Sequence, residues 1–86
     1  MQLVINKDGA SLNVKEGMFI VKADEEIRTF SIDKVESVLI TRNVSLSSAA
    51  IRLAVENDIE IIFIDRSGSP YARVWSSESI FHNKKD

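Results

Sequence analysis

The sequence predicts a small two-layer domain of the α+β class, mostly β, with one helix at about residues 46–57. Short runs of apolar and β-branched residues, separated by turn residues, recur along most of the 86-residue chain and are typical of strands. Only residues 46–57 combine a helical spacing of apolar residues with a length sufficient for a stable helix. An apolar run at residues 59–65 follows directly, as in a crossover between parallel strands. We therefore expect a sheet or sandwich of about seven or eight short strands with one helix.

The first two strands are expected at residues 3–6 and 11–15. Asp8 and Gly9 lie between them and favour a tight turn, because both residue types tolerate a positive φ. We therefore predict that residues 11–15 return as the second strand of an antiparallel hairpin.

Two more strands are expected before the middle of the chain. Residues 15–17 form a break, after which residues 18–22 are rich in β-branched and aromatic side chains. Residues 23–26 form a polar turn, and side chains of residues 27–32 alternate between two faces. This alternation predicts a half-buried strand.

A fifth strand is expected at residues 35–41, after a turn at residues 33–34. Val38, Leu39 and Ile40 form a continuous apolar run, which is typical of a strand covered on both faces. We expect this strand in the interior of a sheet, flanked by edge strands closer to the N-terminus.

The predicted helix has an N-cap and a terminator. Ser45 or Ser47 can cap its first turn, because a serine hydroxyl accepts a hydrogen bond from a free backbone N–H. Asn57 and Asp58 can end it, since both tolerate left-handed geometry. The helix is amphipathic. Its apolar face carries Leu46, Ala50, Leu53 and Ala54, and its polar face carries Ser48, Arg52 and Glu56.

The last elements are a buried strand, a turn and a returning strand. Residues 59–65 are apolar at nearly every position and predict a fully buried strand, parallel to the strand before the helix. Residues 65–70 predict a turn, and residues 71–75 a last strand that pairs back. We expect a domain over residues 1–75, with residues 76–86 as a linker or tail.

The composition excludes several classes of protein. The chain has 44% hydrophobic and 28% charged residues and a net charge of −2, without a basic tract, so we expect it to hold nucleic acid only weakly by itself. It has no cysteine, which excludes disulfides and thiolate sites. No apolar run reaches the length of a membrane span and no signal peptide is evident, so we expect a cytoplasmic protein without a membrane partner.

No catalytic or metal-binding constellation is predicted. His82 is the only histidine and lies in the expected tail, without a carboxylate at a spacing that would orient it. Asp65 follows a buried strand, where it either stabilises the next turn through the backbone or acts as a functional carboxylate. We favour the turn.

Three arginines are the candidate binding residues. Arg52 lies within an Ala- and Leu-rich helix and either pairs with Glu56 at i+4 or contacts a phosphate or partner. Arg66 and Arg73 border the last turn and strand, near Tyr71 and Trp75. Aromatic side chains among arginines can stack on bases, although we favour a core role for Trp75.

The central part of the chain resembles a known family. The segments are IDKVESVLI (residues 32–40), NVSLSSAAIRLA (43–54), DIEIIFIDRSG (58–68) and ARV (72–74), preceded by GASLNVKEGMFIV (9–21). Their ordered combination resembles the N-terminal domain of the CRISPR-associated integrase, the first-numbered Cas protein, which inserts new spacers into CRISPR arrays. The resemblance covers about residues 1–75 and is far more specific than any single segment.

The resemblance implies a β-rich N-terminal domain with one helix, joined by a linker to a larger helical domain. The family's DNA cleavage and transesterification use a Glu, a His and an Asp that bind Mg²⁺ or Mn²⁺. Those residues belong to the C-terminal domain and none is matched here, His82 included. The chain by itself is therefore expected to be non-catalytic, while its full-length parent is a metal-dependent endonuclease and integrase.

The resemblance also implies partners. Family members form a homodimer through their N-terminal domains, assemble with the second-numbered Cas protein and bind double-stranded DNA. Arg52 and Arg73 match positions where the family carries arginines that contact the DNA backbone, and Arg66 is a weaker match. The alternative is a stand-alone protein-interaction domain without DNA chemistry. A free-standing nucleic-acid binder is disfavoured by the charge balance.

Overall fold

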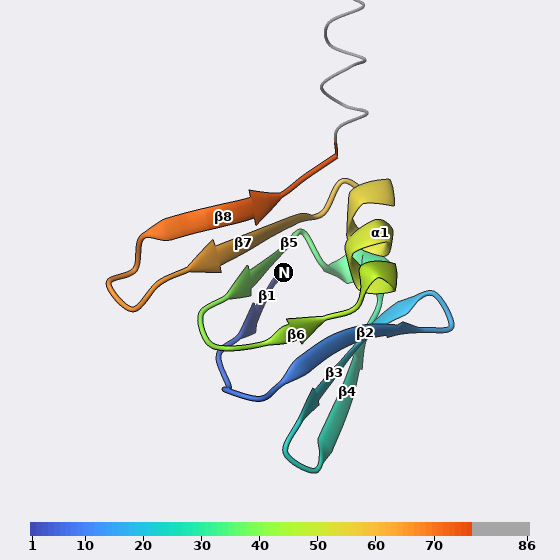
Figure 1. Cartoon of the computed structure of the whole chain (residues 1–86). Coiled ribbons are helices and arrows are strands. Elements are labelled where there is room, and N and C mark those ends of the chain that lie inside the picture. The colour runs from blue at the N-terminus through green and yellow to red at the C-terminus, as the bar shows by residue number, and fades with distance from the viewer. Residues whose placement is uncertain (77–86) are drawn as a thin grey trace, which may run out of the picture.

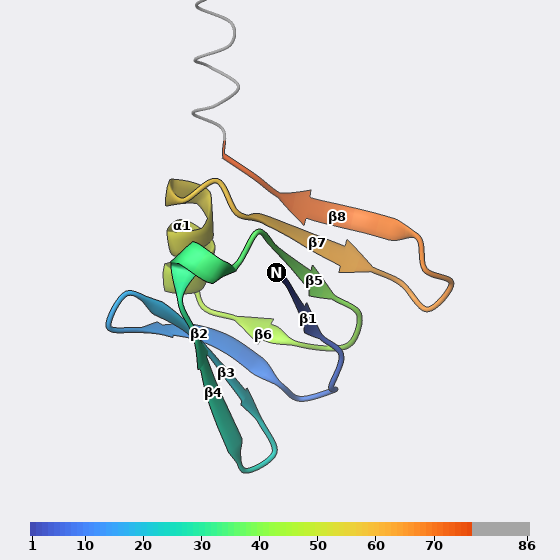
Figure 2. The same ribbon diagram turned by 180° about the vertical axis from the view of Figure 1, so that it is seen from behind.

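The computed structural model describes residues 1–76 and confirms a mostly β fold with one helix. Eight strands form two four-stranded sheets, with a 3₁₀ helix η1 and an α-helix α1 in their connections (Figures 1 and 2). The elements are β1 (Gln2–Ile5), β2 (Ser11–Lys15), β3 (Met18–Ala23), β4 (Glu26–Phe30), η1 (Ile32–Lys34), β5 (Ser37–Ile40), β6 (Ser45–Leu46), α1 (Ser48–Glu56), β7 (Glu60–Ile64) and β8 (Pro70–Val74).

Sheet A has the strand order β1-β5-β7-β8, with β1, β5 and β7 parallel and β8 antiparallel to β7. The predicted parallel pairing of the strands on either side of the helix is therefore confirmed. The strand expected at residues 35–41 lies in the interior of this sheet, as predicted, although one of its two neighbours is the later strand β7.

Sheet B has the order β4-β3-β2-β6. Tight antiparallel turns join β2, β3 and β4, and the first of these has positive φ at both Glu16 (53°) and Gly17 (74°). Two consecutive positive φ values match the right-handed twist of paired strands. The predicted turns at residues 15–17 and 23–26 are therefore confirmed.

The predicted hairpin between the first two strands is wrong. β1 pairs with β5 in sheet A, while β2 belongs to sheet B. A turn does form at Gly9, which has a φ of 85°, but it carries the chain from one sheet to the other. The carboxylate of Asp8 accepts a hydrogen bond of 2.9 Å from the backbone N–H of Asn43, so the turn contacts a distant connection instead of closing a hairpin.

The core lies between the sheets and is closed by α1, which contacts β2 and β7. Each sheet buries alternate side chains on its inner face, because successive strand residues point to opposite faces. The buried hydrophobic residues are Leu3, Ile5, Ala10, Leu12, Phe19, Val35, Val38, Ile40, Ala50, Ala54, Ile59 and Ile61. Ala50 and Ala54 are fully buried on the helix face that was predicted to be apolar.

Three strands are less buried than predicted. β4 is an edge strand that is mostly exposed, and Ile32 belongs to η1. β5 buries Val38 and Ile40 but leaves Leu39 half-buried, and β7 buries only Ile61 fully. The inner face of sheet A is thus covered, whereas its outer face has no covering element among residues 1–76.

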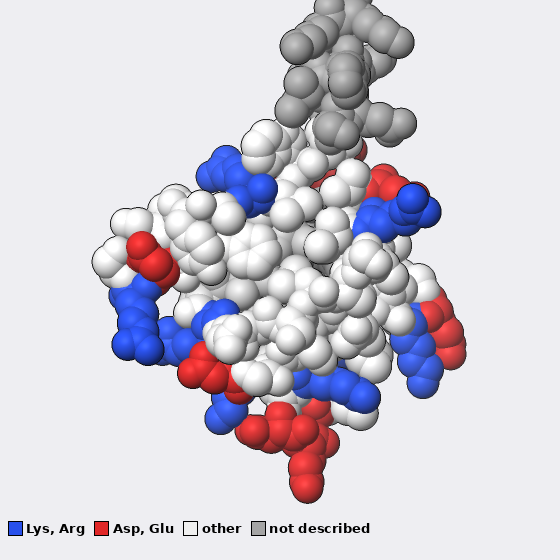
Figure 3. Space-filling model, in the orientation of Figure 1, with Lys and Arg blue, Asp and Glu red and all other residues white. Residues whose placement is uncertain are grey.

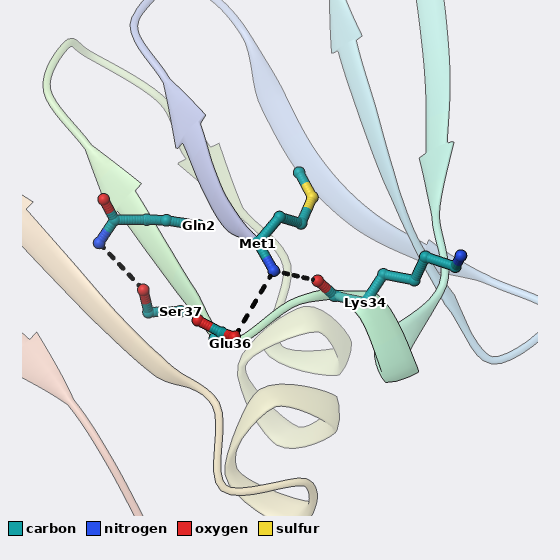
Figure 4. A network of polar contacts seen from close by, with 5 residues as sticks. All are labelled: Met1, Gln2, Lys34, Glu36 and Ser37. Carbon is teal, nitrogen blue, oxygen red and sulfur yellow. Dashed lines mark hydrogen bonds and ion pairs between the residues drawn. The ribbon is translucent and has the colours of Figure 1, made fainter.

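The start of β1 is held by a polar network with the segment before β5 (Figure 4). The N-terminal amine donates to the carbonyl of Lys34 at 2.6 Å and lies 3.9 Å from the carboxylate of Glu36. Gln2 Nε2 donates to Ser37 Oγ at 3.0 Å. These contacts support the parallel register at the first residues of β1 and β5.

Ser47, one of the two predicted caps, is the N-cap of α1, and the helix begins at Ser48 instead of residue 46 because Ser45 and Leu46 form β6. Ser47 Oγ accepts a hydrogen bond of 3.1 Å from the backbone N–H of Ala50. We expect Ser47→Ala to lower the free energy of unfolding by about 1 kcal/mol, because the first turn loses its side-chain acceptor.

Urea unfolding followed by circular dichroism measures this change, and Ser45→Ala is the matched control. The hydroxyl of Ser45 makes no hydrogen bond to any residue from 1 to 76, so its loss should change stability by less than about 0.5 kcal/mol. Equal losses for the two variants would contradict the capping role.

Candidate nucleic-acid interface

Arg52 is exposed on the polar face of α1. The predicted ion pair with Glu56 does not form, and Arg52 makes no ion pair with any other residue of the part of the chain that is described. Its guanidinium is therefore free to contact a phosphate or a partner.

Arg73 lies on β8, at the edge of sheet A, and pairs with Glu60 of β7. The distance from Arg73 Nη1 to Glu60 Oε2 is 3.1 Å, and both side chains are partly exposed. Part of the charge of Arg73 is thus balanced within the sheet, and a phosphate would have to compete with this carboxylate.

Arg66 lies in the turn between β7 and β8, which is organised by Asp65. Asp65 Oδ1 accepts hydrogen bonds from the hydroxyl and backbone N–H of Ser67, at 2.7 and 2.9 Å, and from the N–H of Ser69 at 3.0 Å. These hydrogen bonds lower the pKa of Asp65 below its ordinary value of 3.8, and the bond from the Ser67 hydroxyl has the largest effect. Asp65 therefore stabilises the turn, as the favoured interpretation of the sequence proposed.

The three predicted arginines do not form one surface. The turn that carries Arg66 and the helix that carries Arg52 lie at opposite sides of the molecule in Figures 1 and 2. On the face shown in Figure 3, basic and acidic side chains are interspersed, and the basic ones are densest near the β7–β8 turn. His82 and the predicted tail from residue 77 onward lie outside the described residues.

Arg42 is a basic residue that the sequence reasoning missed. It lies two residues after the end of β5, and together with Arg66 it lines a hollow of about 440 Å³ at the carboxyl ends of the parallel strands. The signal that could have found it was its position: Asp65 was singled out because it follows a buried strand, and Arg42 has the same relation to the strand before it.

The two aromatic side chains near these arginines are exposed. Tyr71 is 66% exposed and lines the same hollow, with its ring centroid 6.2 Å from that of Phe63. Trp75 is 50% exposed, so the predicted core role for this residue is wrong. It lies one residue beyond the edge strand β8, whose last paired residue is Val74, opposite Ile61 of β7.

The outer face of sheet A is apolar at its centre. The strand register places Val4, Leu39, Ile62 and Arg73 in one row across β1, β5, β7 and β8. Val4 is 48% exposed, and Leu39 and Ile62 are half-buried although no element of residues 1–76 covers them. A face of this kind is suited to contact another protein surface.

Residues 1–76 contain no group of three or more His, Cys, Asp or Glu side chains that could hold a metal ion. The residues present therefore do not fit the Mg²⁺ or Mn²⁺ that the resemblance implies for the full-length enzyme. No helix in this part of the chain is long and apolar enough to cross a membrane.

The family model described as CRISPR associated protein Cas1 matches residues 3–83. The chain belongs to the Cas1 family. The resemblance found in the sequence is thereby confirmed.

Characterised relatives support this membership. The chain is 32% identical over 69 residues to CRISPR-associated endonuclease Cas1 2 of Saccharolobus solfataricus, covering 80% of this chain and 22% of the relative. It is 29% identical over 82 residues to CRISPR-associated endonuclease Cas1 1 of Pyrobaculum aerophilum, covering 92% of this chain and 26% of the relative. The chain thus spans about a quarter of the length of these Cas1 relatives.

Solved structures share the fold. A CAS1 protein from Thermotoga maritima superposes with a TM-score of 0.78 at 15% identity, over 91% of this chain and 25% of that one. A TtCas1–DNA complex matches with a TM-score of 0.76 at 15% identity, over 88% of this chain and 29% of that one. A partial Cas6-RT-Cas1–Cas2 complex matches with a TM-score of 0.81 at 23% identity, over 100% of this chain and 26% of that one.

We expect the turn at Asp65 to contribute stability that depends on pH. Because the pKa of Asp65 is lower in the folded chain than in the unfolded one, its contribution to stability is present above the unfolded pKa and is lost as the pH falls through the folded pKa. We expect Asp65→Asn to destabilise the fold at about pH 7, with a difference from wild type that shrinks as the pH falls below 3.8, the ordinary pKa of the carboxyl group.

Thermal unfolding across this pH range measures the effect. Glu25→Gln is the control, because Glu25 lies in another exposed turn and its carboxylate makes no hydrogen bond or ion pair within residues 1–76. A pH-independent effect of Asp65→Asn would contradict the role of the charged carboxylate.

Proposed function

We propose that the chain is the N-terminal, non-catalytic domain of a Cas1 integrase and endonuclease, and that it supplies dimerisation and positions DNA. The observation that carries the proposal is that this chain of the Cas1 family spans only about a quarter of the length of its relatives. In addition, residues 1–76 contain no cluster of metal-ligand side chains. The metal-dependent chemistry, with Mg²⁺ or Mn²⁺, then belongs to a helical C-terminal domain.

The proposed partners are a second copy of the chain, Cas2 and double-stranded DNA, in the cytoplasm. A TtCas1–DNA complex and Cas6-RT-Cas1–Cas2 complexes contain chains with this fold, which supports both Cas2 and DNA as partners. Exposed Arg52 and partly exposed Arg73 are the proposed contacts to the DNA backbone, and Arg66 is a further candidate. With a net charge of −2, the isolated chain should bind DNA weakly and in a salt-dependent manner.

The apolar outer face of sheet A supports the proposed dimerisation. Val4, Leu39 and Ile62 form its centre, and the oppositely charged pair of Arg73 and Glu60 lies toward its β8 edge. In a two-fold symmetric contact the same patch lies on both copies, so the patch must be complementary to itself. An apolar centre with one positive and one negative side chain beside it meets this requirement. The same face favours the alternative, a protein-interaction domain without DNA chemistry, if its occupant is another protein.

The double variant Arg52→Ala, Arg73→Ala tests the DNA contact. We expect weaker binding of duplex DNA, and a slope of log affinity against log salt whose magnitude decreases by about 1 for each phosphate that an arginine no longer neutralises. Fluorescence anisotropy with a labelled duplex, over a series of salt concentrations, measures both quantities.

Arg28→Ala is the matched control, since Arg28 is also an exposed arginine beside a carboxylate, 3.7 Å from Glu26 on β4. Its removal should leave the slope unchanged. An unchanged slope for the double variant as well would favour the protein-interaction alternative.

Val4→Lys tests the dimer. Val4 is 48% exposed on the edge strand β1, where a lysine is tolerated by the fold, but a charge at the centre of the contact should weaken self-association at least about tenfold. Sedimentation equilibrium of the 86-residue chain measures the dissociation constant.

Ile27→Lys places the same charge on the edge strand β4 of the other sheet, at a position 58% exposed, and should leave self-association unchanged. A chain that is monomeric at all concentrations, or a dimer that resists Val4→Lys, would contradict the proposed interface.

A further inference from the structure

The hollow at the carboxyl end of sheet A arises from the topology. After β5 the chain leaves sheet A for β6 in sheet B, whereas after β7 it turns back within sheet A as β8. The two connections therefore diverge, and Figures 1 and 2 show both at the same end of the sheet. A crevice outside the carboxyl ends of parallel strands, where neighbouring connections diverge, is the usual place for a ligand in open α/β sheets.

The size and lining of this hollow suit a small ligand or one unit of a polymer. Its volume of about 440 Å³ lies within the ~300–1,000 Å³ that is typical of ligand pockets. Its lining comes from the end of β5 and the connection after it, the end of β7 with the turn to β8, the start of β8, and the turn between β1 and β2. The lining residues used below are Asp8, Thr41, Arg42, Asn43, Asp65, Arg66 and Tyr71.

The two guanidinium groups of the hollow form no ion pair with the carboxylates that share its lining. Neither Arg42 nor Arg66 forms an ion pair with a residue of the described chain. Asp65 Oδ1 accepts from Ser67 and Ser69, and Asp8 Oδ1 accepts from the backbone N–H of Asn43 at 2.9 Å. One oxygen of each carboxylate is thus bound within the loops around it, but both negative charges remain in the lining. An anion would therefore bind on the side of the arginines, whose N–H groups are not held in an ion pair.

Other donors and an aromatic ring complete the lining. Arg42 donates from Nη1 to the carbonyl of Thr41 at 3.1 Å, and its other side-chain N–H groups make no hydrogen bond within residues 1–76. The side chains of Thr41 and Asn43 make no hydrogen bond within residues 1–76. Tyr71 is 66% exposed, and its contact with Phe63 restrains the ring without covering it.

We propose that this hollow binds one nucleotide unit, with its phosphate held by Arg42 and Arg66 and its base stacked on Tyr71. Arginine forks match phosphate oxygens, and an aromatic face accepts any base. A base that is free to stack on a side chain is unpaired, so the ligand is a nucleoside phosphate, either free or in a single-stranded segment. The choice of nucleic acid rests on the proposed function, but the site is separate from Arg52 and Arg73.

Titrations of the ¹⁵N-labelled 86-residue chain, followed by amide chemical shifts, test the site. The probes are a deoxynucleoside monophosphate, a short single-stranded oligonucleotide, a blunt duplex and inorganic phosphate. We expect residues 41–43 and 65–71 to shift with the first two probes, and phosphate alone to bind at least about tenfold more weakly because it lacks a base. Shifts with both the monophosphate and the oligonucleotide indicate a site for a free nucleotide. Shifts with the oligonucleotide alone indicate a site for a nucleotide within a single strand.

Three variants separate the contributions of the phosphate and the base. Arg42→Gln with Arg66→Gln should weaken binding of the oligonucleotide by about tenfold or more, and Tyr71→Ala by a similar factor for the base-bearing probes only. Arg28→Gln, distant on β4, should change neither. Correct folding of each variant is shown by the unchanged amide spectrum of sheet B.

The outcomes also distinguish this site from the proposed function. Absent shifts at residues 41–43 and 65–71, phosphate binding as tightly as the nucleotide, or full binding by the double glutamine variant would overturn the site. If the duplex still binds through Arg52 and Arg73 in that case, the proposed function stands without it.

Discussion

Two stretches of the chain, residues 2–12 and 37–46, run parallel through both sheets, and the rest of the fold depends on this pairing. β1 lies beside β5 in sheet A, and β2 lies beside β6 in sheet B. Between the sheets the stretches stay in contact, because Gly9 donates to the carbonyl of Asn43 at 2.9 Å and Asn43 donates to Asp8 at the same distance. The second sheet is thereby placed over the first, which allows Leu12 and Phe19 to be buried against Val38 and Ile40.

The same pairing determines which surfaces are left for function. Sheet B and α1 cover the inner face of sheet A, whereas the outer face of that sheet has no partner among residues 1–76. Because β5 leaves toward sheet B while β7 turns back to β8, the carboxyl end of sheet A stays open. The protein contact and the ligand contact that we propose thus lie on different faces of a domain with a small core.

The charge distribution agrees with a domain that positions DNA within a larger assembly. Arg52 and Arg73 lie on different elements, and the net charge of −2 provides no general attraction for a polyanion. If each exposed arginine contributes one local contact, as we propose, useful affinity requires several copies of the domain or further domains acting together.

The sequence by itself determined the local elements and the family. The helix with its Ser47 cap, the turn at Asp65 and the parallel strands around the helix follow from caps, turn residues and apolar periodicity, all of which act over a few residues. Only the tertiary structure decided the partner of β1, the exposure of Trp75 and the outer face of β5 and β7, and the meeting of Arg42 with Arg66. An Asp-Gly turn is compatible with either a hairpin or a change of sheet, and an apolar strand does not reveal which of its faces is covered. Such choices depend on contacts between residues more than thirty positions apart, such as Asp8 with Asn43, which local patterns do not contain.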